Sequence, residues 1–414
     1  MSSAPPASAS SPFAPAGKSG SAPASRPLAA RLVLRQLENL DRGTLQLQLP
    51  DGSSHRCGQG HGPGEAELRI NDWSVFGRVM RDGDIGFAEG YLDGQWDTPD
   101  LTALLTLLAN NRAGLDAPLY GSGVGRLLHR LVHALRANTR AGSRRNIAAH
   151  YDLGNDFYAL WLDPGMTYSG ALFATGYETL AEAQQAKYAR ALSELRLSPG
   201  SDVLEIGCGW GGFAEQCTRA GHRVTGLSLS QRQLDYAGER LSLVKRAGQA
   251  KLEFRDYRDI AGRFDAVASI EMVEAVGERW WPAYFARIAQ VLPSGGRALV
   301  QSILIDEALF ERYRRGSDFI QQYIFPGGML PSGERFASLA GAAGLAVEKD
   351  FRFGADYART LALWRERFHA QADAVRALGF DERFMRMWHF YFSYCEAGFL
   401  SGSTDLAQFT LVRR

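Results

Sequence analysis

Two short runs near the start of the chain alternate apolar and polar residues. Residues 44–49 and 66–70 place an apolar side chain at every second position, and this period of two predicts β-strands with one buried face. Over residues 101–108 the leucines recur instead at intervals of three and four, which predicts a helix with one apolar face. We therefore expect a small α+β domain over residues 29–115.

From residue 201 onward, short apolar runs alternate with longer stretches of helical periodicity. The apolar runs predict strands at residues 202–206, 223–227, 252–254, 264–270, 298–303 and 408–412. Such alternation builds a parallel sheet with helices on both faces. We predict an α/β fold over residues 146–414, with a doubly wound, mostly parallel sheet and helical insertions. Aromatic residues at helical spacing over residues 355–400 suit either a core or the lining of an apolar tunnel.

Two further segments stand out by composition. Residues 1–28 are mostly Ser, Ala, Pro and Gly with a single aromatic residue, so we expect a disordered tail. Residues 116–145 are rich in Arg, with leucines at helical spacing, and predict a basic amphipathic linker helix. Such a helix either packs between domains or lies on an anionic membrane surface.

Charge and cysteine content exclude several classes of protein. The chain has 46 basic and 45 acidic residues, so no overall field favours a nucleic-acid partner. Its four cysteines lack the CxxC spacing of a zinc site or the pairing of a disulfide framework, and we expect no metal and a reducing cytoplasm. No apolar run approaches the roughly 18 residues of a spanning helix, so any membrane contact is expected to be peripheral.

The strongest motif is an apolar strand that runs into a glycine-rich turn at residues 203–212. Gly207, Gly209 and Gly211 allow a ligand to approach the backbone closely. The string GCGWGG also fits the dinucleotide pattern GxGxxG, so spacing alone does not separate hydride transfer from methyl transfer. Glu205 favours methyl transfer, because a carboxylate there can pair with the α-ammonium group of S-adenosylmethionine, whereas NAD offers no cation at that place.

Residues after the next two strands are candidates for the rest of this cofactor. Asp256 offers an acceptor for an adenine amino group, and Tyr257 offers a flat apolar neighbour for the ring. Many doubly wound sheets hold the ribose with an acid at the end of the second strand. Here Ser228, or Gln233 beyond it, is expected to bind the ribose instead.

Several separate strings resemble the cyclopropane-fatty-acyl-phospholipid synthase family, which includes the mycolic acid cyclopropane synthases. The resemblance covers roughly residues 145–400 and rests on 146–158, 166–169, 207–212, 229–233, 269–274, 323–328 and 356–361. It implies a Rossmann-like class I methyltransferase fold and S-adenosylmethionine as cofactor. It also implies that Tyr168, Ser169 and Leu229 contribute to the cofactor site.

The resemblance further implies methyl transfer to the cis double bond of an unsaturated phospholipid acyl chain, followed by proton loss and closure of a cyclopropane ring. The family is understood to hold bicarbonate as the base through a cysteine, a glutamate, a histidine and a tyrosine. Glu274 and Tyr357 match two of these positions, whereas Gly170 and Gln301 replace the cysteine and the histidine. These replacements hold an anion less strongly.

We therefore hypothesise that Gln301, Tyr357 and Glu274 still bind the base, with cyclopropane as the expected product. A methyl-branched or methylene product without a ring is the alternative. The expected partner is an unsaturated phospholipid at the inner face of the membrane, to which a cytoplasmic protein attaches peripherally. No nucleic acid is expected, and a homodimer stays open. Two rivals are an N-methyltransferase for small amines and a non-catalytic lipid-binding homologue.

Overall fold

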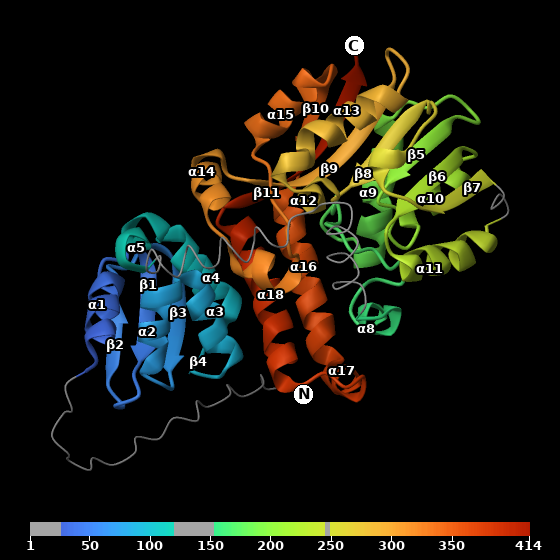
Figure 1. Cartoon of the computed structure of the whole chain (residues 1–414). Helices are drawn as coiled ribbons and strands as arrows, with labels where there is room; N and C mark the ends of the chain where they lie inside the picture. The colour runs from blue at the N-terminus through green and yellow to red at the C-terminus, as the bar shows by residue number, and fades with distance from the viewer. Residues whose placement is uncertain (1–25, 120–152, 245–248) are drawn as a thin grey trace, which may run out of the picture.

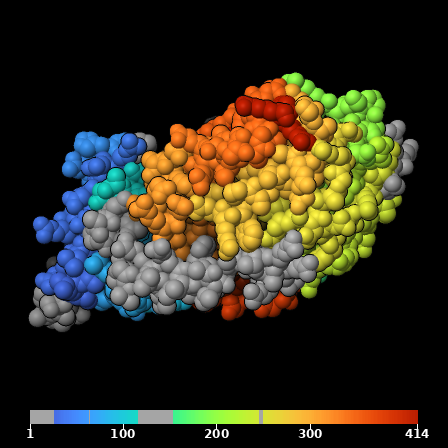
Figure 2. All heavy atoms as spheres, turned by 45° about the horizontal axis from the view of Figure 1, so that its top comes forward, coloured from blue at the N-terminus to red at the C-terminus, as the bar shows by residue number. Residues whose placement is uncertain are grey.

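The computed structural model describes residues 26–119, 153–244 and 249–414. Most of the predicted tail and of the predicted basic helix therefore lies outside the described residues. The remainder forms two domains in an elongated molecule, with the N-terminal domain at one end (Figures 1 and 2). Among the described residues, no helix combines the length and apolar character needed to cross a bilayer.

The N-terminal domain is a four-stranded sheet with helices, in the strand order β2-β1-β3-β4. Its strands are β1 Arg42–Gln48, β2 Ser54–Cys57, β3 His61–Ile70 and β4 Trp96–Asp97, and its helices are α1 Leu28–Leu37, α2 Ser74–Asp82, α3 Asp84–Leu92, α4 Leu101–Asn110 and α5 Arg112–Leu119. β1 and β3 contain the two alternating runs, and Leu45 and Leu47 are buried while Gln48 is exposed. This alternation accounts for the strands, and together with the helices they give the domain its predicted α+β character.

The second domain is built on a seven-stranded sheet in the order β10-β11-β9-β8-β5-β6-β7. Its strands are β5 Asp202–Ile206, β6 Arg223–Ser228, β7 Ala250–Phe254, β8 Ala266–Ile270, β9 Arg297–Ile305, β10 Leu345–Arg352 and β11 Thr404–Arg413. β7, β6, β5, β8 and β9 run parallel, and β11 pairs antiparallel with both of its neighbours, β9 and β10. The predicted doubly wound fold is confirmed. β10 escaped prediction because it is a largely exposed edge strand without an apolar pattern.

Helices cover this sheet and extend from it toward the N-terminal domain (Figure 1). They are α8 Asn155–Ala159, α9 Leu180–Glu194, α10 Gly212–Arg219, α11 Gln231–Ser242, α12 Val273–Val276, α13 Trp281–Val291, α14 Glu307–Arg315, α15 Gly333–Ala342, α16 Gly354–Ala370, α17 Ala372–Ala377 and α18 Glu382–Leu400. A short π-helical turn spans Ile320–Ile324. The five parallel strands β5 to β9 have their carboxyl ends on the same side of the sheet. A ligand is expected on that side.

The long helix α18 joins the two domains. Glu396 on α18 accepts a 3.0 Å hydrogen bond from Thr102 of α4, and His389 lies 2.9 Å from the hydroxyl of Tyr91 in α3. Its aromatic residues, with those of α8 and α16, pack ring against ring around the fully buried Trp161. Many of the aromatic residues at helical spacing therefore form a core within the second domain.

Candidate active site

The glycine-rich turn leaves the carboxyl end of β5 and opens a cavity there. Gly207 has a φ of 83° and Gly209 a φ of 50°, a region that favours glycine. A Cβ atom on Gly207 would lie only 2.2 Å from Cγ of Met272. The bare backbone is thus needed for both the turn and the close packing of the next loop.

Glu205 lies at the end of β5 and lines this cavity. Its side chain is buried, with 3% of the residue exposed, and its Oε2 atom has no hydrogen-bond partner among the described residues. Burial raises the pKa of this carboxyl group to about 8, although Arg240 and Lys187 oppose the rise. A buried carboxylate oxygen without a partner is suited to an incoming ammonium group.

The cavity also collects most of the other predicted cofactor residues. Its lining includes Tyr168, Ser169, Gly207, Gly209, Ser228, Leu229, Gln233 and Tyr257. The hydroxyl of Ser228 bonds Oε1 of Gln233 at 3.0 Å, so the two candidates for the ribose lie together. Tyr257 has a buried hydroxyl group without a partner in the part of the chain that the structure describes.

Two predicted cofactor residues do not line the cavity. Gly211 lies behind the turn, where its φ of 82° lets α10 begin directly after it. Asp256 is buried, and its carboxylate accepts hydrogen bonds from the Arg258 backbone at 2.9 Å and from the Arg258 guanidinium at 2.5 Å. An acceptor engaged by an adjacent arginine is a weaker adenine ligand than the sequence suggested, so Tyr257 is the better placed of the pair.

A second carboxylate, that of Glu271, lies directly after β8 and was not predicted. Its Oε1 atom accepts hydrogen bonds of 2.8 Å from the Gly170 backbone and 2.8 Å from the Gln301 amide, and its Oε2 atom accepts one of 2.8 Å from the Tyr357 hydroxyl. Gln301 is held for this task, because its Oε1 atom accepts a bond from Gln408 at 2.9 Å. Gly170, Gln301 and Tyr357, three positions that the family resemblance had singled out, therefore all donate hydrogen bonds to Glu271, which was not predicted.

Lys187 lies near this carboxylate. Its ammonium group is fully buried and donates a 2.5 Å hydrogen bond to Ser169. Desolvation lowers the pKa of Lys187 to about 7, and Glu271 is the largest of the charges that oppose this. Burial raises the pKa of Glu271, against the effects of Lys187 and its three hydrogen-bond donors. The site thus holds a desolvated, firmly oriented carboxylate.

Glu274, three residues later, has a different environment. One oxygen accepts a 2.5 Å bond from the Ile303 backbone, and the other is buried with no partner among the residues described. Burial, and next the charge of Glu271, raise the pKa of Glu274 to about 8. At neutral pH, Glu274 is therefore mostly protonated and able to donate a proton or a hydrogen bond.

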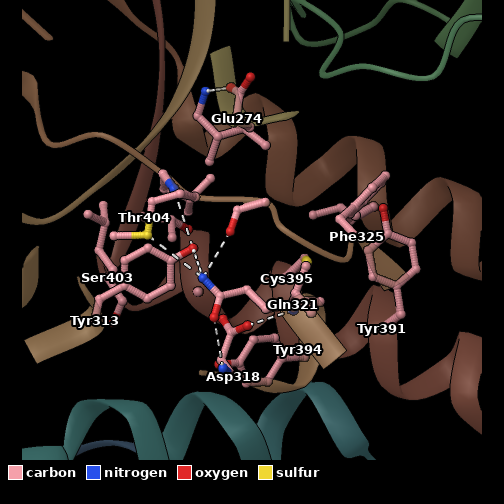
Figure 3. Close-up of a pocket in the computed structure, with 18 of the residues that line it drawn as sticks. Glu274, Tyr313, Asp318, Gln321, Phe325, Tyr391, Tyr394, Cys395, Ser403 and Thr404 are labelled. Atoms are coloured by element: carbon pink, nitrogen blue, oxygen red, sulfur yellow. Dashed lines mark hydrogen bonds between the residues drawn. The ribbon is translucent and has the colours of Figure 1, made fainter. Parts of the chain in front are cut away.

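The cavity continues from these acids toward the N-terminal domain and has a volume of about 830 Å³, at the upper end of the usual range of roughly 300–1,000 Å³ for ligand sites. Figure 3 shows Gln321 in its wall, between Tyr313 and Asp318. The Gln321 amide donates to the Gly328 carbonyl at 2.9 Å and lies 3.3 Å from the Tyr313 hydroxyl. Beyond this polar patch, the lining is mostly apolar and includes residues of β3, α2 and α4.

The comparison with protein families identifies what these features belong to. The family model described as mycolic acid cyclopropane synthetase matches residues 138–409, about two thirds of the chain. The chain belongs to this family. As a family member it is an S-adenosylmethionine-dependent methyltransferase, and its family acts on lipid acyl chains.

Individual relatives agree with this assignment. The tuberculostearic acid methyltransferase UfaA1 of Mycobacterium tuberculosis is 38% identical, over 95% of this chain and 92% of the relative. The cyclopropane-fatty-acyl-phospholipid synthase of Escherichia coli strain K12 is 33% identical, over 85% of this chain and 89% of its own. The crystal structure of the mycolic acid cyclopropane synthase CmaA1 with SAH and CTAB matches at a TM-score of 0.62 and 31% identity, covering 65% of this chain and 98% of that one.

The cavity fits S-adenosylmethionine, because Glu205 offers a carboxylate oxygen without a partner among the described residues, beside a turn in which Gly207 and Gly209 present bare backbone. It does not fit the bicarbonate that the resemblance implied. The Glu271 carboxylate already takes the hydrogen bonds of Gly170, Gln301 and Tyr357. The sequence does carry a signal for Glu271, because this residue directly follows an apolar strand, and Glu205 lies close to the end of another. The family motif pointed to Glu274 instead.

Binding of the cofactor is expected to release a proton at pH 7. Glu205, with a pKa of about 8 in the free protein, is mostly protonated there, and a neighbouring ammonium group favours its ionised form. Affinity should therefore rise between pH 6 and pH 8 and then level off. Calorimetric titration in two buffers of different ionisation enthalpy measures the release. A binding heat independent of the buffer in the wild type, or equal release by Glu205→Gln, would contradict this assignment.

Proposed function

We propose that this methyltransferase transfers a methyl group to a carbon of a cis double bond in a phospholipid acyl chain and gives an open-chain, unsaturated product. The observation that carries the proposal is the continuous, mostly apolar cavity, which runs from Glu205 past Glu271 into the N-terminal domain. Its depth and lining suit a long alkyl chain rather than a small polar amine. A dry cavity also protects a carbocation from water.

The comparisons support an acyl substrate. The CmaA1 structure contains CTAB, a detergent with one long alkyl chain, and both relatives above are named for fatty-acid products. Three arginines, Arg112 of α5 and Arg312 and Arg315 of α14, line the cavity. Guanidinium groups are suited to a lipid phosphate, so a phospholipid is preferred to a free fatty acid.

When bound, the sulfonium cofactor supplies an electrophilic methyl group. The protein's own residues then have three tasks: Glu205 fixes the amino acid end of the cofactor, the cavity holds the alkene, and a base accepts a proton. The open-chain product is preferred because the relative that matches 95% of this chain is named for tuberculostearic acid. Cyclopropane remains the second candidate, since the E. coli relative and the family model carry that name.

We further propose peripheral attachment to the inner face of the membrane, because the acyl chains of phospholipids lie within the bilayer and the cavity must receive them from there. The predicted basic helix, which would make that contact, lies outside the described residues. Attachment thus rests on the chemistry of the proposed substrate.

Lipid analysis tests the proposed function. The gene is expressed in a bacterium that contains unsaturated phospholipids but makes no methylated fatty acids, with methionine that carries 13C in its methyl group in the medium. We expect labelled acyl chains that carry one additional carbon as a branch. The NMR spectrum of the purified ester should show olefinic proton signals. Cells carrying Gly207→Ala, in which we expect weakened cofactor binding, provide the control. Ring protons in place of olefinic ones would establish the cyclopropane product, and label in amines instead of lipids would reject acyl transfer.

A further inference from the structure

We propose that Glu271 is the base of the reaction, built into the chain in place of a separately bound anion. This inference rests on the proposed function and adds the residue that receives the proton. It starts from three donors that converge on one carboxylate: the Gly170 backbone, the Gln301 amide and the Tyr357 hydroxyl, each at 2.8 Å.

The donor set has the form of an anion site. All three groups donate, they come from three separate parts of the chain, and together they satisfy both carboxylate oxygens. Gln301 cannot turn its oxygen toward Glu271 without giving up its 2.9 Å bond from Gln408, which in turn accepts a 2.5 Å bond from Arg190. The chain thus presents a site for one carboxylate group, and its own side chain fills it.

The backbone conformation of Glu271 is energetically unfavourable. Glu271 has a φ of 52°, in the left-handed region that is unfavourable for a residue with a side chain. Its backbone N–H is held by the Gln301 carbonyl at 2.8 Å. Strained positions of this kind persist where the surrounding structure enforces them, and they cluster at functional sites.

The space around Gly170 also supports the role of Glu271. A Cβ atom on Gly170 would lie 2.9 Å from the Tyr357 ring and 2.5 Å from Leu406. A larger residue at 170 would therefore displace Tyr357, which is one of the donors to Glu271. The glycine that departs from the family pattern is what lets Tyr357 reach this carboxylate.

The chemical step balances without a further reactant. Transfer of the methyl group forms a carbon–carbon bond as the carbon–sulfur bond breaks, which leaves a positive charge on the acyl chain. A C–H bond of that chain then breaks, its electron pair forms the double bond of the product, and the proton passes to a carboxylate oxygen of Glu271. Desolvation raises the pKa of Glu271, which makes its anion a stronger base.

Chemical rescue tests the assignment. Glu271→Gly removes the carboxylate, relieves the backbone strain and leaves the three donors in place. We expect a loss of activity of about 100-fold or more, the range of general-base catalysis, with the affinity for S-adenosylhomocysteine unchanged. Millimolar formate or bicarbonate should restore at least about tenfold and should raise the melting temperature of this variant only. Glu278→Gln, which changes a partly exposed acid seven residues later, should behave as the wild type.

The outcomes separate the two proposals. A wild-type enzyme that yields no methylated lipid would reject the proposed function, whatever Glu271 does. An active wild type that loses activity in bicarbonate-free buffer, or a Glu271→Gly variant that stays active, would overturn the assignment of the base. So would a variant that binds cofactor normally but regains no activity with any of these anions.

Discussion

Replacing Gly207 by Ala is expected to weaken the binding of S-adenosylmethionine by at least about 30-fold. The new Cβ atom would lie 2.2 Å from Cγ and 2.4 Å from the sulfur of Met272, and the φ of 83° adds a penalty of roughly 1–2 kcal/mol. Met272 lines the cavity, so its displacement moves side-chain atoms into the cofactor site. Calorimetric titration with S-adenosylhomocysteine measures the loss.

Gly295→Ala is the matched control. Gly295 has a similar φ of 74°, but its added Cβ atom would meet no atom within 4 Å. This variant shares the backbone penalty of about 1–2 kcal/mol in the free energy of unfolding and should bind cofactor normally. Equal affinities of the two variants would show that the close contact with Met272 has no role in shaping the site.

Trp161→Ala is expected to cause the largest loss of stability, about 3–5 kcal/mol in the free energy of unfolding. The Trp161 ring is fully buried and lies 5.3–5.6 Å from the rings of Tyr168, Trp364 and Trp388. Because Tyr168 lines the cavity, activity should fall even at temperatures where the variant stays folded. Urea unfolding followed by circular dichroism measures the change.

Tyr177→Ala controls for the removal of an aromatic side chain. Tyr177 is 94% exposed, and changes at such positions usually shift the free energy of unfolding by less than about 0.5 kcal/mol. A Trp161→Ala protein as stable as this control would mean that the aromatic cluster between α8, α16 and α18 does not hold the second domain together.

Two acids illustrate how environment sets role within one cavity. Glu271 accepts three hydrogen bonds, which favour its anion, whereas Glu274 accepts one and keeps a buried oxygen without a partner among the described residues. Both have raised pKa values because both are desolvated. Their difference lies in the nearby charge of Lys187 and in the three donors to Glu271, which are supplied by β9, α16 and the loop that contains Gly170. Lys187 and the three donors thus favour the anion of Glu271, whereas the charge of Glu271 favours the neutral form of Glu274.

The sequence by itself determined the architecture and the cofactor end of the site. Alternation of period two located β1 and β3, and the apolar runs located β5, β6, β8 and β9, because these strands bury at least one face. Glu205 and the glycines could be read together since they are neighbours in the chain. In the second domain only the exposed edge strand β10, which buries little, left no pattern, and the short strands β2 and β4 of the N-terminal domain were not predicted either.

Only the tertiary structure shows how Glu271 meets its three hydrogen-bond donors. The partners of Glu271 come from positions 101 residues before it and 30 and 86 residues after it. Their meeting depends on how the ends of β8 and β9 adjoin α16, which no local periodicity encodes. The same holds for Asp256, whose carboxylate is engaged by Arg258. The type of a residue determines which hydrogen bonds and charges its side chain can offer. The packing of segments that are distant in the sequence determines which partner that side chain meets.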